Sequence, residues 1–217
     1  TGASRGAFIP SMMDRKIYNE DGVGGMHVYS PWWLDNKKLD FPRGYHIEVW
    51  GGMSMPNYGF GYDPNGLNKY LGLKPGGYGD SLRDDVKKYY GATVGFGGRG
   101  EGLARKENYC EIDPTTVDQY GIPVLKFNYQ WSDYEREQAK HMHETFEEIS
   151  HNMGGIYLSE KPGKDRDYGL HAPGEIIHEV GTTRMGDDPT TSVTNKFSQL
   201  HDVDNVFIVD AGVFVSQ

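Results

Sequence analysis

The sequence has 217 residues, a formal net charge of −9, 36% hydrophobic residues, 30 glycines and 15 tyrosines. This length can bury the core of one large domain or two small ones. The acidic charge and the scattered basic residues argue against a phosphate backbone as ligand, so nucleic acid is not an expected partner. A single cysteine excludes an internal disulfide and a cysteine-based metal site. No apolar run reaches the ~18 residues that a membrane span needs.

The first 79 residues are expected to form loops and short strands, because Gly, Pro, Asn and Asp interrupt them repeatedly. A short helix is expected over 81–90, where Ser81 can cap the start and Gly91 can follow the end. Alternating or short apolar runs between turn residues predict strands. These strands are expected over 45–49, 92–96, 109–112 and 123–129.

The clearest predicted element is a long helix over 132–153. Ser132 and Glu135 have the spacing of a capping box, in which the glutamate reaches back to the first amide. Apolar residues then recur at steps of three and four and form one stripe. Gly154 can end the helix because it tolerates the left-handed conformation. The stripe consists of Ala139, Met142, Phe146, Ile149 and Met153.

Strands joined by hairpin-like turns, together with one long amphipathic helix, predict an α+β fold. A mostly antiparallel sheet would carry helices on one face. Val206–Val209 differs, because it is apolar at every position and suits a strand buried on both faces, as in a parallel sheet. No other segment supplies such a sheet. Residues 205–217 are therefore assigned to a domain that the chain lacks, and residues 1–204 to the domain that is present.

Two patterns imitate known binding motifs. Gly95–Gly100 satisfies GxGxxG, but a dinucleotide site needs a helix after the last glycine, and Glu101-Gly102 opposes one. We interpret this segment as a glycine-rich strand end or bulge. His141 and His143 point about 200° apart on a helix and cannot share an ion, so we interpret them as solvated histidines. No metal site is expected, and a metal hydrolase lacks a credible ligand set.

Aromatic residues at 32–33, 50 and 58–62 could form a surface for flat, amphipathic ligands or could pack in the core. The strongest candidate for chemistry is His178, which ends an apolar run and leads into the turn at Gly181-Thr182. Imidazole titrates near neutral pH and can take a hydroxyl proton as a hydride leaves carbon. An alcohol oxidation would also need a cofactor as hydride acceptor, because no side chain can accept a hydride.

The segment His178–Gly186 and the later Asn205–Gly212 together resemble the C-terminal signature of the glucose–methanol–choline (GMC) family of flavin oxidoreductases. Residues 101–131 also look like the substrate domain of this family. The resemblance implies that His178 faces the flavin and acts on the substrate hydroxyl. It further implies a cofactor-binding set, in which the first three residues contact FAD through their backbone: Asp210, Ala211, Gly212, Gly181 and Thr182.

The resemblance implies an FAD-dependent dehydrogenase or oxidase acting on a sugar or another alcohol, most similar to bacterial sugar and glycoside dehydrogenases. Glu179 stands where the family often has proline. The FAD-binding domain is missing, and the second catalytic His or Asn is expected beyond Gln217, so the chain alone should be inactive. An electron-transfer subunit is a further candidate partner. Bacterial periplasm and cytoplasm both remain open as compartments.

The alternative function is a non-catalytic, β-rich carbohydrate-binding domain. Aromatic abundance and acidic charge allow it. It would leave the pattern from His178 to Thr182 without an explanation, which favours the enzyme.

Overall fold

The computed structural model describes residues 8–12, 27–29, 39–42, 44–51, 79–89, 91–157, 161–173, 175 and 178–215. The aromatic runs at 32–33 and 58–62, the side chain of Trp50 and the apolar run before His178 lie outside this description. The elements in chain order are β1 (Phe8–Met12), β2 (His27–Tyr29), β3 (Tyr45–Gly51), α2 (Asp80–Tyr89), β4 (Thr93–Gly100), β5 (Tyr109–Val117), β6 (Pro123–Asn128), α3 (Asp133–Asn152), β7 (Ile156–Tyr157) and the 3₁₀ turns η3 (Lys164–Gly169) and η4 (Ala211–Val213).

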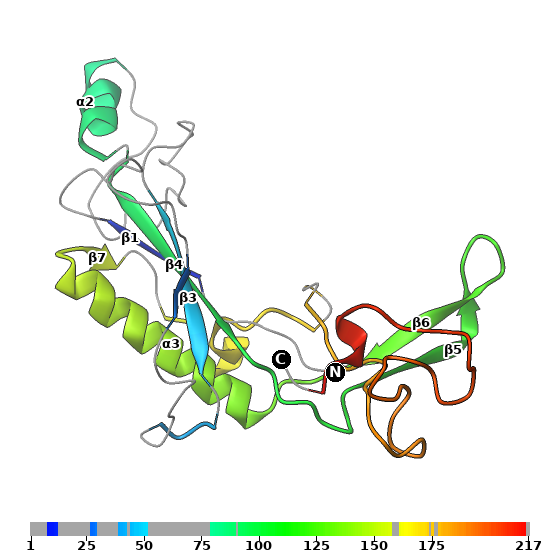
Figure 1. The fold of residues 1–217 in the computed structure, drawn as a ribbon. Coiled ribbons are helices and arrows are strands. Elements are labelled where there is room, and N and C mark those ends of the chain that lie inside the picture. The colour runs from blue at the N-terminus through cyan, green and yellow to red at the C-terminus, as the bar shows by residue number, and fades with distance from the viewer. Residues whose placement is uncertain are drawn as a thin grey trace.

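The strands form two antiparallel sheets. One has five strands in the order β2-β3-β4-β1-β7, and the other is the two-stranded ribbon β5-β6. Figure 1 shows α3 running along the five-stranded sheet, while the ribbon lies at the other end of the molecule beside the C-terminal segments. Mostly antiparallel sheets with few helices are observed, which confirms the mostly antiparallel sheet of the predicted α+β fold. No helix in the described ranges is long and apolar enough to cross a membrane.

The main core lies between the sheet and α3. Tyr45 and Ile47 on β3 and Phe96 on β4 are buried against Met142 and Phe146, which belong to the predicted apolar stripe. Alternate residues of an extended strand share a face, and residues three or four apart share a helix face. Burying these side chains removes apolar surface from water at roughly 25 cal/mol per Å², which stabilises the pairing of sheet and helix.

Helix α3 has the predicted boundaries and caps. The backbone N of Ser132 donates to Glu135 Oε2 at 2.6 Å, which is the reach-back contact of the capping box. Glu135 is buried and also accepts from Leu103 N at 3.0 Å. The same carboxylate therefore connects the segment that follows β4 to the start of the helix. Gly154 follows the helix with φ of +78°. The short helix predicted over 81–90 is confirmed as α2.

The GxGxxG segment forms the last six of the eight residues of β4 and pairs regularly with β3 from Tyr45↔Gly100 to Trp50↔Gly95. It is therefore the end of a strand without a bulge in this pairing. A Cβ at Gly98 would lie 2.6 Å from Met142 Sδ, and one at Gly100 would collide with the side chain of Gln138. The glycines at these positions let α3 approach the sheet closely.

We expect Gly98→Ala to lower the free energy of unfolding by about 1–3 kcal/mol, because the new methyl group overpacks the core against Met142. Urea unfolding of the purified protein measures this change. In a Met142→Ala background the effect of Gly98→Ala should shrink, since Met142 Sδ, the nearest atom, is gone and only Phe146 Cζ at 3.0 Å remains of the three nearest contacts. Equal losses in both backgrounds would contradict this account of the glycine.

The interpretation of both helix histidines as solvated is wrong for His143, which is only 3% exposed. Its Nε2 lies 2.7 Å from Tyr168 O, and its Nδ1 has no partner among the described residues. The reason is non-local, because η3 packs on this side of α3. His141 is half-buried, and its Nδ1 lies 2.8 Å from the Tyr45 hydroxyl.

Burial lowers the pKa of His143, and the neighbouring Lys161 acts in the same direction, although the Tyr168 carbonyl opposes it. Folding therefore favours the neutral ring. Its contribution is present above the unfolded pKa of about 6.5 and is lost as pH falls from that value toward the lower pKa of the folded state. We expect the free energy of unfolding to fall as the pH is lowered below about 6.5. His143→Gln, which can still donate to Tyr168 O, should show a smaller fall in urea unfolding, and an unchanged pH dependence would contradict this assignment.

Val206–Val209 does not belong to either sheet. Phe207 makes only an isolated bridge to Gln199 within the described chain, and Val209 is 91% exposed. The assignment of this segment to another domain stays a prediction.

Candidate functional site

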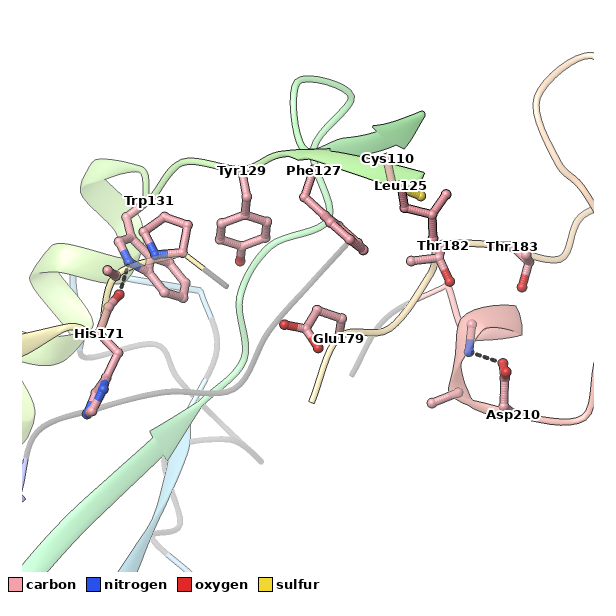
Figure 2. Close-up of a pocket in the computed structure, with 14 residues that line it drawn as sticks. Cys110, Leu125, Phe127, Tyr129, Trp131, His171, Glu179, Thr182, Thr183 and Asp210 are labelled. Carbon is pink, nitrogen blue, oxygen red and sulfur yellow. Dashed lines mark hydrogen bonds between the residues drawn. The ribbon is translucent and has the colours of Figure 1, made fainter. Parts of the chain in front are cut away.

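A cavity of about 830 Å³ lies between the ribbon β5-β6, the chain that follows it, and the C-terminal segments. Figure 2 shows aromatic side chains along one side and the threonines and Asp210 at one end. Its volume falls within the range of ~300–1,000 Å³ that is typical of small-molecule sites. It is lined by Cys110, Leu125, Phe127, Tyr129, Trp131, His171, Ala172, Pro173, Glu179, Thr182, Thr183, Asp210, Ala211 and Gly212.

The aromatic wall follows from the alternation of β6. Leu125 and Phe127 lie on one face of the ribbon, opposite Ile112 and Cys110 respectively, and the same spacing continues to Tyr129. The rings of Tyr129 and Trp131 meet edge to face, with centroids 5.0 Å apart. Trp131 is buried, and its indole N–H donates to His171 O at 2.8 Å, which fixes this end of the wall.

The polar wall is made by two segments that lie side by side. Gly181 N donates to Ala211 O at 3.3 Å, and Thr183 N donates to Gly212 O at 2.9 Å. Asp210 is the N-cap of η4, and its Oδ1 accepts from Gly212 N at 2.8 Å. Gly181 has φ of +80°, which explains the glycine there. These contacts hold residues 181–183 and 210–212 together.

Gly212 sits where polar side-chain atoms converge. A Cβ built on it would lie 2.6 Å from Thr183 Oγ1 and 2.8 Å from both Thr182 Oγ1 and Asp210 Oδ1. The Thr183 hydroxyl is buried and has no partner within the described ranges. A buried hydroxyl without a partner is unfavourable unless a ligand or water satisfies it.

The predicted site residues are distributed as follows. Thr182, Asp210, Ala211 and Gly212 line the cavity, and Gly181 is bonded to Ala211. His178 is exposed and stands one residue before the lining residue Glu179. The structure leaves the chemical role of His178 as a prediction.

Sequence reasoning did not assign the aromatic wall, Glu179 or Thr183 to the site. The wall had one available signal, because Leu125, Phe127, Tyr129 and Trp131 recur at every second position. A single sequence offers no comparable signal for Glu179, because the aromatic residues that share the cavity with it are distant in sequence.

Comparison with known proteins places these features in a family. The sequence model of the GMC oxidoreductase family matches residues 104–217. The chain is 28% identical over 140 residues to gluconate 2-dehydrogenase flavoprotein from Pantoea cypripedii, covering 63% of this chain and 22% of the relative. It is 29% identical over 133 residues to 2-methyl-1,2-propanediol dehydrogenase from Mycolicibacterium austroafricanum, covering 61% of this chain and 23% of the relative. It is 26% identical over 151 residues to the fructose dehydrogenase large subunit from Gluconobacter japonicus, covering 68% of this chain and 26% of the relative.

Proposed function

Because the chain belongs to the GMC oxidoreductase family, we propose that it supplies the substrate side of an FAD-dependent enzyme that oxidises a CH–OH group of a sugar or another alcohol. The observation that carries this proposal is the cavity that joins an aromatic wall to a polar wall built from Thr182, Asp210 and Gly212. The matched regions span about a quarter of the length of the compared relatives. The proposal therefore concerns a longer protein that contains this chain, called the full-length protein below.

The residues at the polar wall fit a bound FAD. The unpartnered Thr183 hydroxyl can bond a ligand, and the absence of a Cβ at Gly212 leaves room for the oxygens of Thr182, Thr183 and Asp210 to converge there. Gly181, Thr182, Asp210, Ala211 and Gly212 would hold the cofactor. When bound, the flavin supplies the hydride acceptor that protein side chains lack.

His178 has a distinct role in the proposal. Its exposed imidazole, one residue from the cavity lining, accepts the proton of the substrate hydroxyl at a ring nitrogen. Trp131 and Tyr129 orient the substrate by contact with its apolar face. The aromatic wall and the polar wall exclude water from the reacting centre.

The exposed apolar residues near the C-terminus support a further domain as partner. Phe197, Phe207 and Val209 are each more than half exposed. Large exposed apolar groups gathered in one region mark an interaction surface. We propose that the FAD-binding domain covers them and that the chain alone is inactive. The relatives named as a flavoprotein and a large subunit support an additional electron-transfer subunit as a partner.

The test compares the full-length protein with the isolated chain. We expect the full-length protein to purify with FAD and to reduce an artificial dye when a sugar or diol is added. The isolated chain should be colourless and inactive. Saturable sugar binding by the full-length protein without FAD or dye reduction would instead support a carbohydrate-binding domain. Flavin binding and turnover by the isolated chain would contradict its proposed inactivity.

A further inference from the structure

One charged side chain enters the cavity from the side opposite the aromatic wall. Figure 2 shows Glu179 extending toward the space beside Phe127 and Tyr129. Glu179 is half-buried, and the described part of the chain gives its carboxylate no hydrogen bond and no ion pair. A carboxylate in such a place can accept hydrogen bonds from a ligand.

The second carboxylate among the described lining residues adds a further negative charge to the cavity. Asp210 is the other carboxylate in the lining, and one of its oxygens is already engaged by Gly212 N. Among the described lining residues there is no lysine or arginine. The net charge of the chain, −9, adds to a negative potential in this region.

We propose that Glu179 determines substrate specificity by selecting neutral polyols and amino sugars against sugar acids. This inference rests on the proposed oxidation of a CH–OH group. A carboxylate accepts charge-assisted hydrogen bonds from neighbouring hydroxyl groups and attracts an ammonium group. It repels an anionic substrate, and the apolar wall beside it weakens screening by water.

The proposal predicts a preference for substrate charge that differs from the one implied by the name of one relative. Gluconate, the substrate in the name of the Pantoea cypripedii relative, is an anion, whereas fructose and 2-methyl-1,2-propanediol are neutral. The described lining residues carry negative charge. In this respect the chain is expected to resemble the enzymes named for neutral substrates.

The experiment uses the full-length protein with FAD bound and three pyranoses that differ in charge: D-glucose, D-glucosamine and D-glucuronate. Binding of each is titrated through the flavin absorbance or tryptophan fluorescence, so turnover is not required. We expect glucose and glucosamine to bind at least about tenfold more tightly than glucuronate. Raising the ionic strength from about 0.02 M to about 0.5 M should reduce this preference.

The variant Glu179→Gln keeps the shape and removes the charge. We expect it to improve glucuronate binding and weaken glucosamine binding, changing the ratio of their dissociation constants by about tenfold or more. The control is Glu148→Gln, which removes one charge from an exposed position of α3 outside the cavity lining and should leave the ratio unchanged.

The outcomes separate this inference from the proposed function. Equal binding of glucose and glucuronate, or equal ratios in Glu179→Gln and Glu148→Gln, would overturn the role of Glu179. Failure of all three sugars to bind would overturn it as well. Alcohol oxidation by the full-length protein is tested separately, by dye reduction with a panel of alcohols. Absence of dye reduction with every alcohol would by itself reject the proposed function.

Discussion

Replacing His178 with alanine in the full-length protein is expected to lower kcat by about 100-fold or more while FAD remains bound. In the proposed mechanism the imidazole accepts the hydroxyl proton, whereas the proposed FAD contacts come from residues 181–183 and 210–212, which pair through their backbones at the cavity. Steady-state dye reduction measures kcat, and the visible spectrum measures FAD content. Because His178 is exposed, added imidazole should restore part of the lost rate.

A matched control is His151→Ala, which removes an exposed histidine from the last turn of α3. It should leave kcat within about twofold of the unchanged protein, as surface substitutions away from a site do. Retention of full activity in His178→Ala would reject the proposed proton transfer. Loss of FAD together with activity would assign His178 to cofactor binding instead.

Gly212→Ala is expected to weaken FAD binding by about tenfold or more, equivalent to about 1.4 kcal/mol. The added Cβ would lie within 2.8 Å of oxygens of Thr182, Thr183 and Asp210, so the polar wall must shift. Titration of the apoprotein with FAD gives the dissociation constant. Adding Thr183→Ala should relieve part of the crowding, since Thr183 Oγ1 is the nearest atom.

The control for this substitution is Gly121→Ala. Gly121 has φ of +79° and lies in the loop between β5 and β6, and a Cβ there meets no atom within 4 Å. Alanine should destabilise the loop by about 1 kcal/mol and leave FAD binding unchanged. Equal FAD affinity in Gly212→Ala and Gly121→Ala would show that the polar wall does not contact the cofactor.

The elements best predicted from sequence are those that local interactions specify. The helix expected over 132–153 is observed as α3, because its caps and apolar stripe are encoded within the segment itself. The strand expected over 109–112 extends to Val117 in β5, with an irregularity in its pairing with β6 after Ile112. Asp113-Pro114 suggests an end of the strand, but pairing with β6 resumes at Val117.

The site was harder to predict because its parts meet through non-local contacts. The resemblance to the GMC family identified both segments of the polar wall, yet their backbone pairing requires the fold. Glu179 and Tyr129 are fifty residues apart and share a cavity only in the folded chain. His143 was misjudged for the same reason, since the segment that covers it follows α3 in the sequence.

The most direct test of the central claim is an anaerobic mixing experiment on the full-length protein. A flavin band at about 450 nm should be present before mixing and should bleach when a sugar or diol is added, because the substrate reduces the cofactor. Bleaching by a neutral polyol is the result that the account predicts. A protein without flavin, or a flavin that no alcohol reduces, would contradict it.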